Sequence, residues 1–517
     1  MHWDSHKGLS LLTDEHDRPA IARLALSFLR AWAYQVGFQM TLLLLVLRSI
    51  YLILFFIYSY TQTSSPFKTI QLKTATLIYL ALFLQCIPFG ISAQSTKQAF
   101  VIGNHRAIFD QHGILQPWKP WSAIIKSEME WYLKCPIEHG YPKFITMTFM
   151  DGHYNPDTSR HDMIPAMQDG MGIISYLKYY AFDGRRNKKI LLWAKYMGDY
   201  LITECNTPDE GKYPKFTRST GLAGVFPQPP DCGRQHDRPY EIEPDKGGIA
   251  GYALFLLYQE TKEKKYLDQA LHNAEVLASN MKTGDSLRSP WAFRVDYRTG
   301  EERMPISGNM VYILRLFDAL NGSGHHEFLR PRQKLWDWIL HYQLPSLEKD
   351  GILWNQFFED HDEISTVNRT AWAPLNLARY LLEKKTEIDI DWRIHAKALI
   401  EFVIANFSGI RLGVPICGEQ DTDKNPWGGI LSTYGAVLAM YSAATGSNEY
   451  KALAWQALNF CLYAVNDDGC PSEQASYPGR GGWQEDSHTD KIHNLVDAMK
   501  AFPEWKSMTT IHAQKVK

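Results

Sequence analysis

The chain has 517 residues, and its 54 lysines and arginines nearly balance its 56 aspartates and glutamates, for a formal net charge of -2. This balance excludes a global basic field that would recruit nucleic acid, and it excludes the strongly acidic composition typical of disorder. The length allows two or three average domains, or one large helical ring with a core of its own. Aromatic residues make up 13% of the chain, and several tryptophans stand in polar segments, where stacking on a sugar ring competes with ordinary packing.

Two apolar runs occur in the first hundred residues, at 41–60 and 75–94. The second run has the order of features of a signal peptide. Lys73 precedes a short apolar stretch, Pro88 breaks it, and small residues near Ala93 suit cleavage. We therefore expect an exported protein, either periplasmic or extracellular.

These features divide the chain into three expected parts. Residues 72–93 form the signal peptide, residues 94–517 form the catalytic domain, and residues 1–71 are the product of an overextended start site. If residues 1–71 are genuine, the apolar run at 41–60 predicts an N-terminal membrane anchor instead. The N-terminal apolar segments are the part that we expect to contact a membrane.

From about residue 160 onward, one pattern repeats. A polar loop with acids, tryptophan and glycine leads into a small-residue apolar helix, and a short turn then leads into an amphipathic helix. The predicted helix pairs span residues 161–205, 247–281, 307–344, 370–407 and 428–465. A last helix at 490–502 is expected to pair with a helix near 121–134.

The two helices of each pair differ in character, which predicts two concentric layers. The first helix is apolar nearly all round, as a helix buried on both sides should be, and the second is charged on one face. Five to six such pairs, with long loops on one side only, predict an all-α fold, an (α/α)6 toroid. A β-hairpin is predicted at 291–304, with its turn at Asp296–Gly300.

The seven cysteines are dispersed, without a CxxC or Cys/His spacing that would indicate zinc. Walker, GxGxxG, GxSxG and HExxH motifs are also absent. We therefore expect no metal and no cofactor. Cys461 and Cys470 are candidates for a disulfide in an oxidising compartment, with two unpaired thiols as the alternative.

The unit at 243–278 resembles the helix pair of the six-hairpin glycosidase superfamily. That superfamily includes unsaturated glucuronyl hydrolases, other uronic-acid-releasing hydrolases and related sugar epimerases. An acid precedes the inner helix, and the helix pair then has a pattern formed by Thr261, Tyr266, Leu267, Ala270 and Ala274. A similar pattern occurs a second time at 445–458. The resemblance covers residues 120–505 and implies an (α/α)6 barrel.

The resemblance also implies a placement for catalytic carboxylates. In the unsaturated uronyl hydrolases, catalytic aspartates stand at the start of inner helices, and Asp162 and Asp245 match that position. Glycosidic cleavage needs a proton donor and an opposed base or nucleophile about 5–9.5 Å away. We expect Asp245 and Asp162 to be this pair, with Glu243 and Asp151 as further candidates. The alternative for each acid is capping of a helix or simple solvation. We expect Glu241, which precedes Glu243 in the same segment, to be solvated.

Arginines in the predicted loops indicate which class of sugar the protein binds. A guanidinium binds a carboxylate in bidentate fashion, which favours a uronic acid over a neutral sugar. Pairing of these arginines with neighbouring loop acids is the alternative. The candidate substrate-binding residues are Arg160, His161, Arg294, Asn368, Arg369, Trp427, Trp483 and His488.

The leading hypothesis is a glycoside hydrolase that releases uronic acid residues from an oligo- or polysaccharide by carboxylate general acid/base catalysis. The first alternative is a polysaccharide lyase or uronyl epimerase of the same toroid fold, because loop histidines, Tyr240 and the Asn368–Arg369 pair offer groups for proton abstraction and charge neutralisation. The alternative of another class is a non-catalytic glycan-binding protein.

Overall fold

The computed structural model describes residues 101–138, 140–142, 164–219, 240–349, 351–355, 368–472 and 487–508. The two N-terminal apolar runs and the predicted signal peptide lie outside these ranges, so the expectations about them stay predictions. Among the residues that the structure describes, no helix combines the length and apolar character that a membrane span requires.

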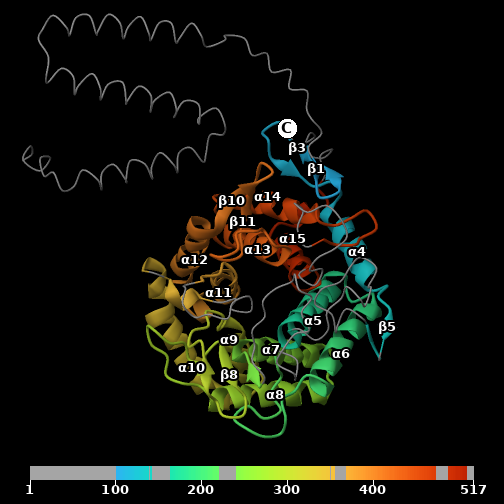
Figure 1. Cartoon of the computed structure of the whole chain (residues 1–517). Coiled ribbons are helices and arrows are strands. Elements are labelled where there is room, and N and C mark those ends of the chain that lie inside the picture. Colours follow the sequence, from blue (N-terminus) through green and yellow to red (C-terminus); the bar gives the residue numbers. More distant parts are fainter. Residues whose placement is uncertain are drawn as a thin grey trace, which may run out of the picture. The chain divides into compact units, whose positions relative to one another are not determined.

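Within the described ranges, six α-helices form a closed inner ring. They are α5 (Pro165–Phe182), α7 (Pro244–Thr261), α9 (Val311–Gly322), α11 (Trp372–Lys384), α13 (Gly428–Thr445) and α15 (Ile492–Ala501). Each helix packs on the next, and α15 returns to contact α5. In Figure 1 the colours follow this order from green at α5 to red at α15. The predicted toroid is therefore confirmed.

An outer helix packs on each inner one. The outer helices are α6 (Lys188–Thr203), α8 (Lys264–Ser279), α10 (Leu329–Trp338), α12 (Trp392–Phe407), α14 (Lys451–Leu462) and α4 (Trp121–Tyr132). The first five follow their inner partners along the chain, whereas α4 precedes the ring in sequence and packs on α15. The predicted pairing of the last helix with one near 121–134 is confirmed.

Small residues explain how closely the helices approach. A Cβ atom at Gly248 of α7 would lie 2.6 Å from Ile313 Cγ1 of α9, and one at Gly435 of α13 would lie 2.5 Å from Leu458 Cγ of α14. Neither distance is possible for a real side chain without movement of its neighbour. The glycines thus permit the close packing that closes the ring, and the apolar side chains of both layers form one continuous core.

Short strands join or precede the helices. A three-stranded antiparallel sheet contains β7 (Glu241–Ile242), β8 (Arg294–Asp296) and β9 (Glu302–Arg303), so the predicted hairpin is confirmed. The two-stranded pairs are β1 (Val101–Ile102) with β2 (His105–Arg106), β3 (Ile108–Phe109) with β4 (Leu115–Gln116), β5 (Ile137–Glu138) with β6 (Tyr141–Pro142), and β10 (Ser408–Arg411) with β11 (Val414–Cys417). The two strands of each pair are antiparallel.

Cys461 and Cys470 are both buried, and Cys461 is a free thiol. The structure therefore does not contain the candidate disulfide between these two cysteines.

Candidate active site

Glu243 and Asp245 lie where strand β7 turns into inner helix α7. Glu243 has an extended backbone at the N-cap, Pro244 occupies the first helical position, and Asp245 lies in the first turn. Proline suits this position because it has no N–H to leave unsatisfied, and an acid suits the positive end of the helix dipole. Both side chains are buried, with exposed fractions of 1% for Glu243 and 0% for Asp245.

Two cations balance these two acids. Lys246 Nζ lies 3.7 Å from Glu243 Oε2 and 3.6 Å from Asp245 Oδ2, and Arg294 Nε lies 3.6 Å from Glu243 Oε1. Lys246 and Arg294 are themselves fully buried. An isolated charge is costly to bury. All four groups stay inside the protein because each acid lies close to a cation. We call Glu243, Asp245, Lys246 and Arg294 the charge cluster.

Asp245 also holds two segments together. Its Oδ1 accepts the backbone N–H of Lys246 at 3.0 Å, so the predicted capping role is partly realised. Its Oδ2 accepts hydrogen bonds from Asn309 Nδ2 at 3.2 Å and from Ser307 Oγ at 3.4 Å, in the segment before α9. The carboxylate is therefore fixed in orientation at the beginning of two neighbouring inner helices.

Glu241, the acid two residues before Glu243, is not solvated. We expected Glu241 to be exposed, but its side chain is buried and Arg303 contacts it with two nitrogens, Nε donating to Oε1 at 2.7 Å and a terminal nitrogen donating to Oε2. The expectation was wrong because β7 and β9 flank the same strand β8, which brings Arg303 to Glu241. Glu241 is thus engaged in a structural ion pair.

The predicted residues Asn368 and Arg369 bind other protein groups. Arg369 forms a bidentate pair with Asp421, with Nε to Oδ2 at 2.8 Å and a terminal nitrogen to Oδ1 at 3.2 Å. Burial raises the pKa of Asp421, but the hydrogen bonds and charge of Arg369 outweigh it, so this pKa lies below its usual range. Asn368 is buried, donates to Gln420 Oε1 at 2.6 Å and accepts from Thr422.

Trp427 and His488 lie at the entrances of two other inner helices. Trp427 is the N-cap residue of α13, half-buried, and its indole N–H donates to Asp423 at 2.9 Å. His488 lies in the π-helical turn η8 (Ser487–Lys491) before α15, with its ring centroid 4.9 Å from that of Tyr132. Burial lowers the pKa of His488 to about 3, so the imidazole is neutral at pH 7.

The remaining predicted residues lie outside the described ranges. They are Asp151, Arg160, His161, Asp162 and Trp483. The Asp245–Asp162 pairing accordingly stays a prediction. Among the residues that the structure does describe, no group of three or more His, Cys, Asp or Glu side chains is arranged to hold a metal ion.

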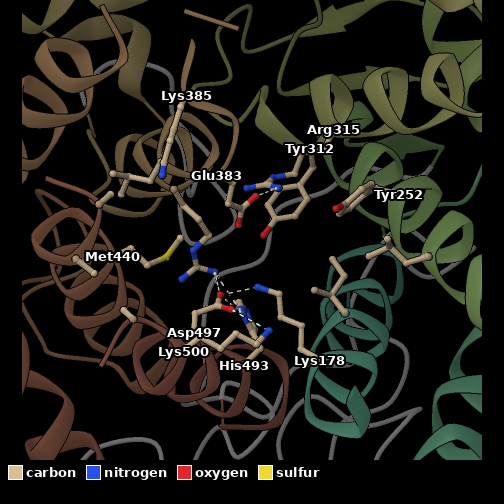
Figure 2. Close-up of a pocket in the computed structure, with 17 residues that line it drawn as sticks. Lys178, Tyr252, Tyr312, Arg315, Glu383, Lys385, Met440, His493, Asp497 and Lys500 are labelled. Carbon is tan, nitrogen blue, oxygen red and sulfur yellow. Dashed lines mark hydrogen bonds and ion pairs between the residues drawn. The ribbon is translucent and has the colours of Figure 1, made fainter. Parts of the chain in front are cut away.

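The sequence reasoning missed a cavity inside the ring, which we call the axial cavity. All six inner helices of the described ring line it, and its volume is about 650 Å³. Figure 2 shows charged and tyrosine side chains directed into it. The charged groups include Lys178, Arg315, Arg379, Glu383, His493 and Asp497. Their sequence signal is that they are isolated charges in otherwise apolar inner helices, whereas the predicted site residues lie in the loops.

No protein-family model matches the chain, and no curated protein matches it. Solved structures are similar at the level of fold. A D-mannose isomerase is 13% identical, with a TM-score of 0.55 over 73% of this chain and 96% of that one. Cellobiose 2-epimerase from Spirochaeta thermophila DSM 6192 is 12% identical, with a TM-score of 0.54 over 74% and 95%. A sugar epimerase from a ruminal bacterium is 11% identical, with a TM-score of 0.50 over 74% and 98%. The chain has an (α/α)6-barrel fold.

In this (α/α)6 barrel, the charge cluster and the axial cavity lie at different levels. Asp245 occupies the first turn of α7, whereas Tyr252 of the same helix lines the cavity. Seven residues separate them in sequence, which corresponds to about 10 Å along a helix axis. The barrel therefore presents two separate polar regions, one at the entrance of α7 and one inside the ring.

Proposed function

We propose that the chain is a carbohydrate-processing enzyme, a glycoside hydrolase that releases uronic acid residues from an oligo- or polysaccharide. The barrel fold supports a sugar substrate, because solved proteins with this fold include an isomerase of D-mannose and an epimerase of cellobiose. The fold alone does not select the reaction. The charge cluster is the observation on which the hydrolase proposal rests.

The cluster combines the two kinds of group that uronate hydrolysis uses. Two carboxylates lie close together, since both are within 3.7 Å of the same Lys246 Nζ atom. In the proposed reaction a carboxylic acid protonates the glycosidic oxygen, the bond from the anomeric carbon to that oxygen breaks, and a carboxylate accepts a proton from the attacking water. We assign Asp245 to this chemistry, with Asp162 as its predicted opposed partner and Glu243 beside it.

The two cations give the cluster its preference for an anionic sugar. Lys246 and Arg294 place two positive charges next to Glu243 and Asp245, where a low-dielectric surrounding strengthens every charge interaction. When one of the two acids carries the proton that general acid catalysis requires, two cations face one carboxylate, and a uronate carboxylate that approaches is attracted by the remaining positive charge, whereas a neutral hexose is not. We therefore expect uronides to be hydrolysed faster than the corresponding glucosides.

The assay compares release of free uronic acid from aryl glucuronides and from lyase-generated unsaturated oligosaccharides. Asp245→Asn keeps the shape of the side chain but cannot exchange a proton, so kcat should fall by about 10²–10⁴. Asp337→Asn, on the exposed face of outer helix α10, is the matched control and should keep the rate. Absence of release from both substrate classes, or an unchanged rate in Asp245→Asn, would sink the proposal. Binding of these glycans without any product would indicate a glycan-binding protein instead.

A second candidate is an isomerase, epimerase or lyase reaction, because the solved barrels above include two sugar epimerases and an isomerase. His488 is a buried neutral imidazole and is able to accept a proton. Its pKa of about 3 makes it a weak base at neutral pH, however, and this favours the hydrolase. Products separate the two: hydrolysis adds one water per bond, whereas epimerisation leaves the mass unchanged and incorporates deuterium from D₂O.

A further inference from the structure

The axial cavity carries an excess of positive charge. Of the residues that the structure describes, five lysines and arginines line it, against two acids, Glu383 and Asp497. Both acids are already engaged: Lys178 Nζ lies 2.5 Å from Asp497 Oδ2, and Arg315 donates to Glu383 at 2.6 Å. Further cations surround the same two acids, so the acids cannot neutralise all of them.

Three cations of the cavity remain beyond Lys178 and Arg315, and Arg379 is the buried one of these three. Its exposed fraction is 2%, and its nearest contact with Asp497 is 3.9 Å. One terminal nitrogen donates to Asn494 Oδ1 and the other lies 3.3 Å from His493 Nδ1. Its Nε–H is buried and makes no hydrogen bond in the part of the chain that the structure describes. A buried guanidinium N–H normally finds an acceptor, so this group is suited to a ligand oxygen.

Two lysines stand at the open side of the cavity. Lys385 and Lys500 both line it and are exposed to solvent. Lys500 lies in the last turn of α15 and Lys385 is the C-cap residue of α11. Cations at these positions complement the helix dipole, which is a structural explanation for both lysines. That explanation does not extend to Arg315, which lies in the first two turns of α9. The positive charge therefore reaches from the rim into the interior.

Aromatic and apolar side chains complete the wall. Tyr252 and Tyr312 line the cavity with ring centroids 6.3 Å apart, alongside Leu256 and Met440. Tyrosine faces next to a few charged groups are typical of small-molecule sites, and the volume of about 650 Å³ lies within the range of such sites. The cavity has room for a molecule the size of a sugar.

We propose that the axial cavity is a binding site for a sugar-sized anion, which carries a carboxylate or a phosphate, and that this site is separate from the charge cluster at the entrance of α7. The anionic group contacts Arg379, and the ring of the ligand packs against Tyr252 or Tyr312. Lys385 and Lys500 attract the anion at the rim.

Calorimetric titration of the full chain tests the charge requirement with three probes of similar size. D-Glucuronate and D-glucose 6-phosphate are the two anionic probes, and D-glucose is the neutral control. We expect at least one anionic probe to bind ten-fold or more tightly than D-glucose, with an affinity that falls as salt is added. Equal affinity for all three sugars, or no binding of either anion, overturns the proposal. The two anionic probes together show whether carboxylate or phosphate is preferred.

Variants locate the bound anion. Arg379→Lys keeps a charge but removes the guanidinium fork, and should weaken the anion more than five-fold while leaving D-glucose unchanged. The double variant Lys385→Ala/Lys500→Ala removes two exposed charges without disturbing the interior, and should weaken the anion several-fold even if Arg379→Lys does not fold. Lys334→Ala, at an exposed position on outer helix α10, is the matched control and should bind normally. Unchanged affinity in the double variant contradicts the proposal.

Asp245→Asn separates this proposal from the proposed activity. Because the charge cluster does not line the axial cavity, this variant should bind the anionic probe as the unaltered protein does, whatever happens to hydrolysis. A changed anion affinity in Asp245→Asn, whether a loss or a gain, would place the anion at the charge cluster and overturn the separate site.

Discussion

Glu243 and Arg294 face each other across two paired strands. Strand β7 pairs with β8 so that Glu241 is opposite Asp296 and Ile242 is opposite Val295. Continuing this register places Glu243 opposite Arg294, and their nearest charged atoms, Oε1 and Nε, are 3.6 Å apart. A two-residue strand thus brings a hairpin arginine to the entrance of an inner helix, more than forty residues earlier in the chain.

This relationship predicts a large loss of stability when the arginine is removed. Arg294→Met leaves Glu243 buried with one cation fewer, and removal of one partner of a buried pair costs about 3–5 kcal/mol. Lys246 remains near Glu243, so we expect the lower end of this range. The free energy of unfolding from urea titration measures the loss.

Arg298→Ala is the matched control in the same hairpin. Arg298 pairs with Asp296 at the surface, and exposed pairs contribute about 0–1 kcal/mol. Losses of equal size in Arg294→Met and Arg298→Ala would contradict the buried role of Arg294.

The ring closure predicts an effect of adding a methyl group at Gly248. The new Cβ would meet Ile313 Cγ1 at 2.6 Å, so Gly248→Ala should destabilise the protein by about 1–3 kcal/mol through overpacking. Gly322, at the end of α9, has no neighbour within 4 Å of such a Cβ among the described residues. Gly322→Ala should therefore be neutral or stabilising. Thermal unfolding of both variants provides the comparison, and a neutral Gly248→Ala would show that α7 and α9 do not pack this closely.

The environment of Asp497 predicts that the stability of the fold decreases at acid pH. Burial raises the pKa of Asp497, but Lys178, His493 and Arg379 together lower it by more than burial raises it. The folded-state pKa of Asp497 therefore lies well below the usual value. A depressed pKa contributes stability above the unfolded-state value of about 3.9, and this contribution is lost as the pH falls toward the folded-state pKa. Stability should therefore decline as the pH is lowered from about 5.

Asp497→Asn removes the titrating group and tests this assignment. The variant should be less stable at pH 7, because Lys178 loses its partner, but its stability should depend less steeply on pH below about 4. Urea titrations at several pH values measure both quantities. An acid limb as steep as that of the unaltered protein would assign the dependence to other carboxylates.

The thiols should be unreactive in the folded protein. Cys461 is 3% exposed, and burial raises the pKa of its thiol to about 12, so almost no reactive thiolate is present at pH 8. Labelling with a thiol reagent should reach Cys461 only after unfolding. Peptide mapping without reduction provides the second readout, and a peptide that links Cys461 to Cys470 would contradict the free thiol of Cys461 in the structure.

The helices of the barrel could be predicted because their signals are local. Inner helix α13 is apolar on every face and outer helix α8 on only one, and each pattern follows directly from how much of the helix is buried. The hairpin around Asp296–Gly300 was also local, since a turn lies between two short strands. Pairing of α4 with α15 spans most of the chain, but it was predictable because a ring requires a partner for its last helix.

The candidate site was only partly predictable. The position of Asp245 in the first turn of α7 follows from the residues around it. The sequence did not reveal that Glu241 pairs with Arg303, or that Arg369 pairs with Asp421, because the two members of each pair are far apart along the chain. Loop arginines look alike in sequence whether they bind a protein carboxylate or a substrate.

By itself, the sequence determined the all-α character of the domain, the order of its helix pairs and their division into buried and amphipathic members, because hydrophobic periodicity acts within one helix. Only the tertiary structure decided which charges meet: Arg294 reaches Glu243 through strand pairing, and Arg379 reaches the axial cavity through closure of the ring. The physical reason is distance along the chain, since electrostatic contacts depend on separation in space, and that separation is set only when all the helices have packed.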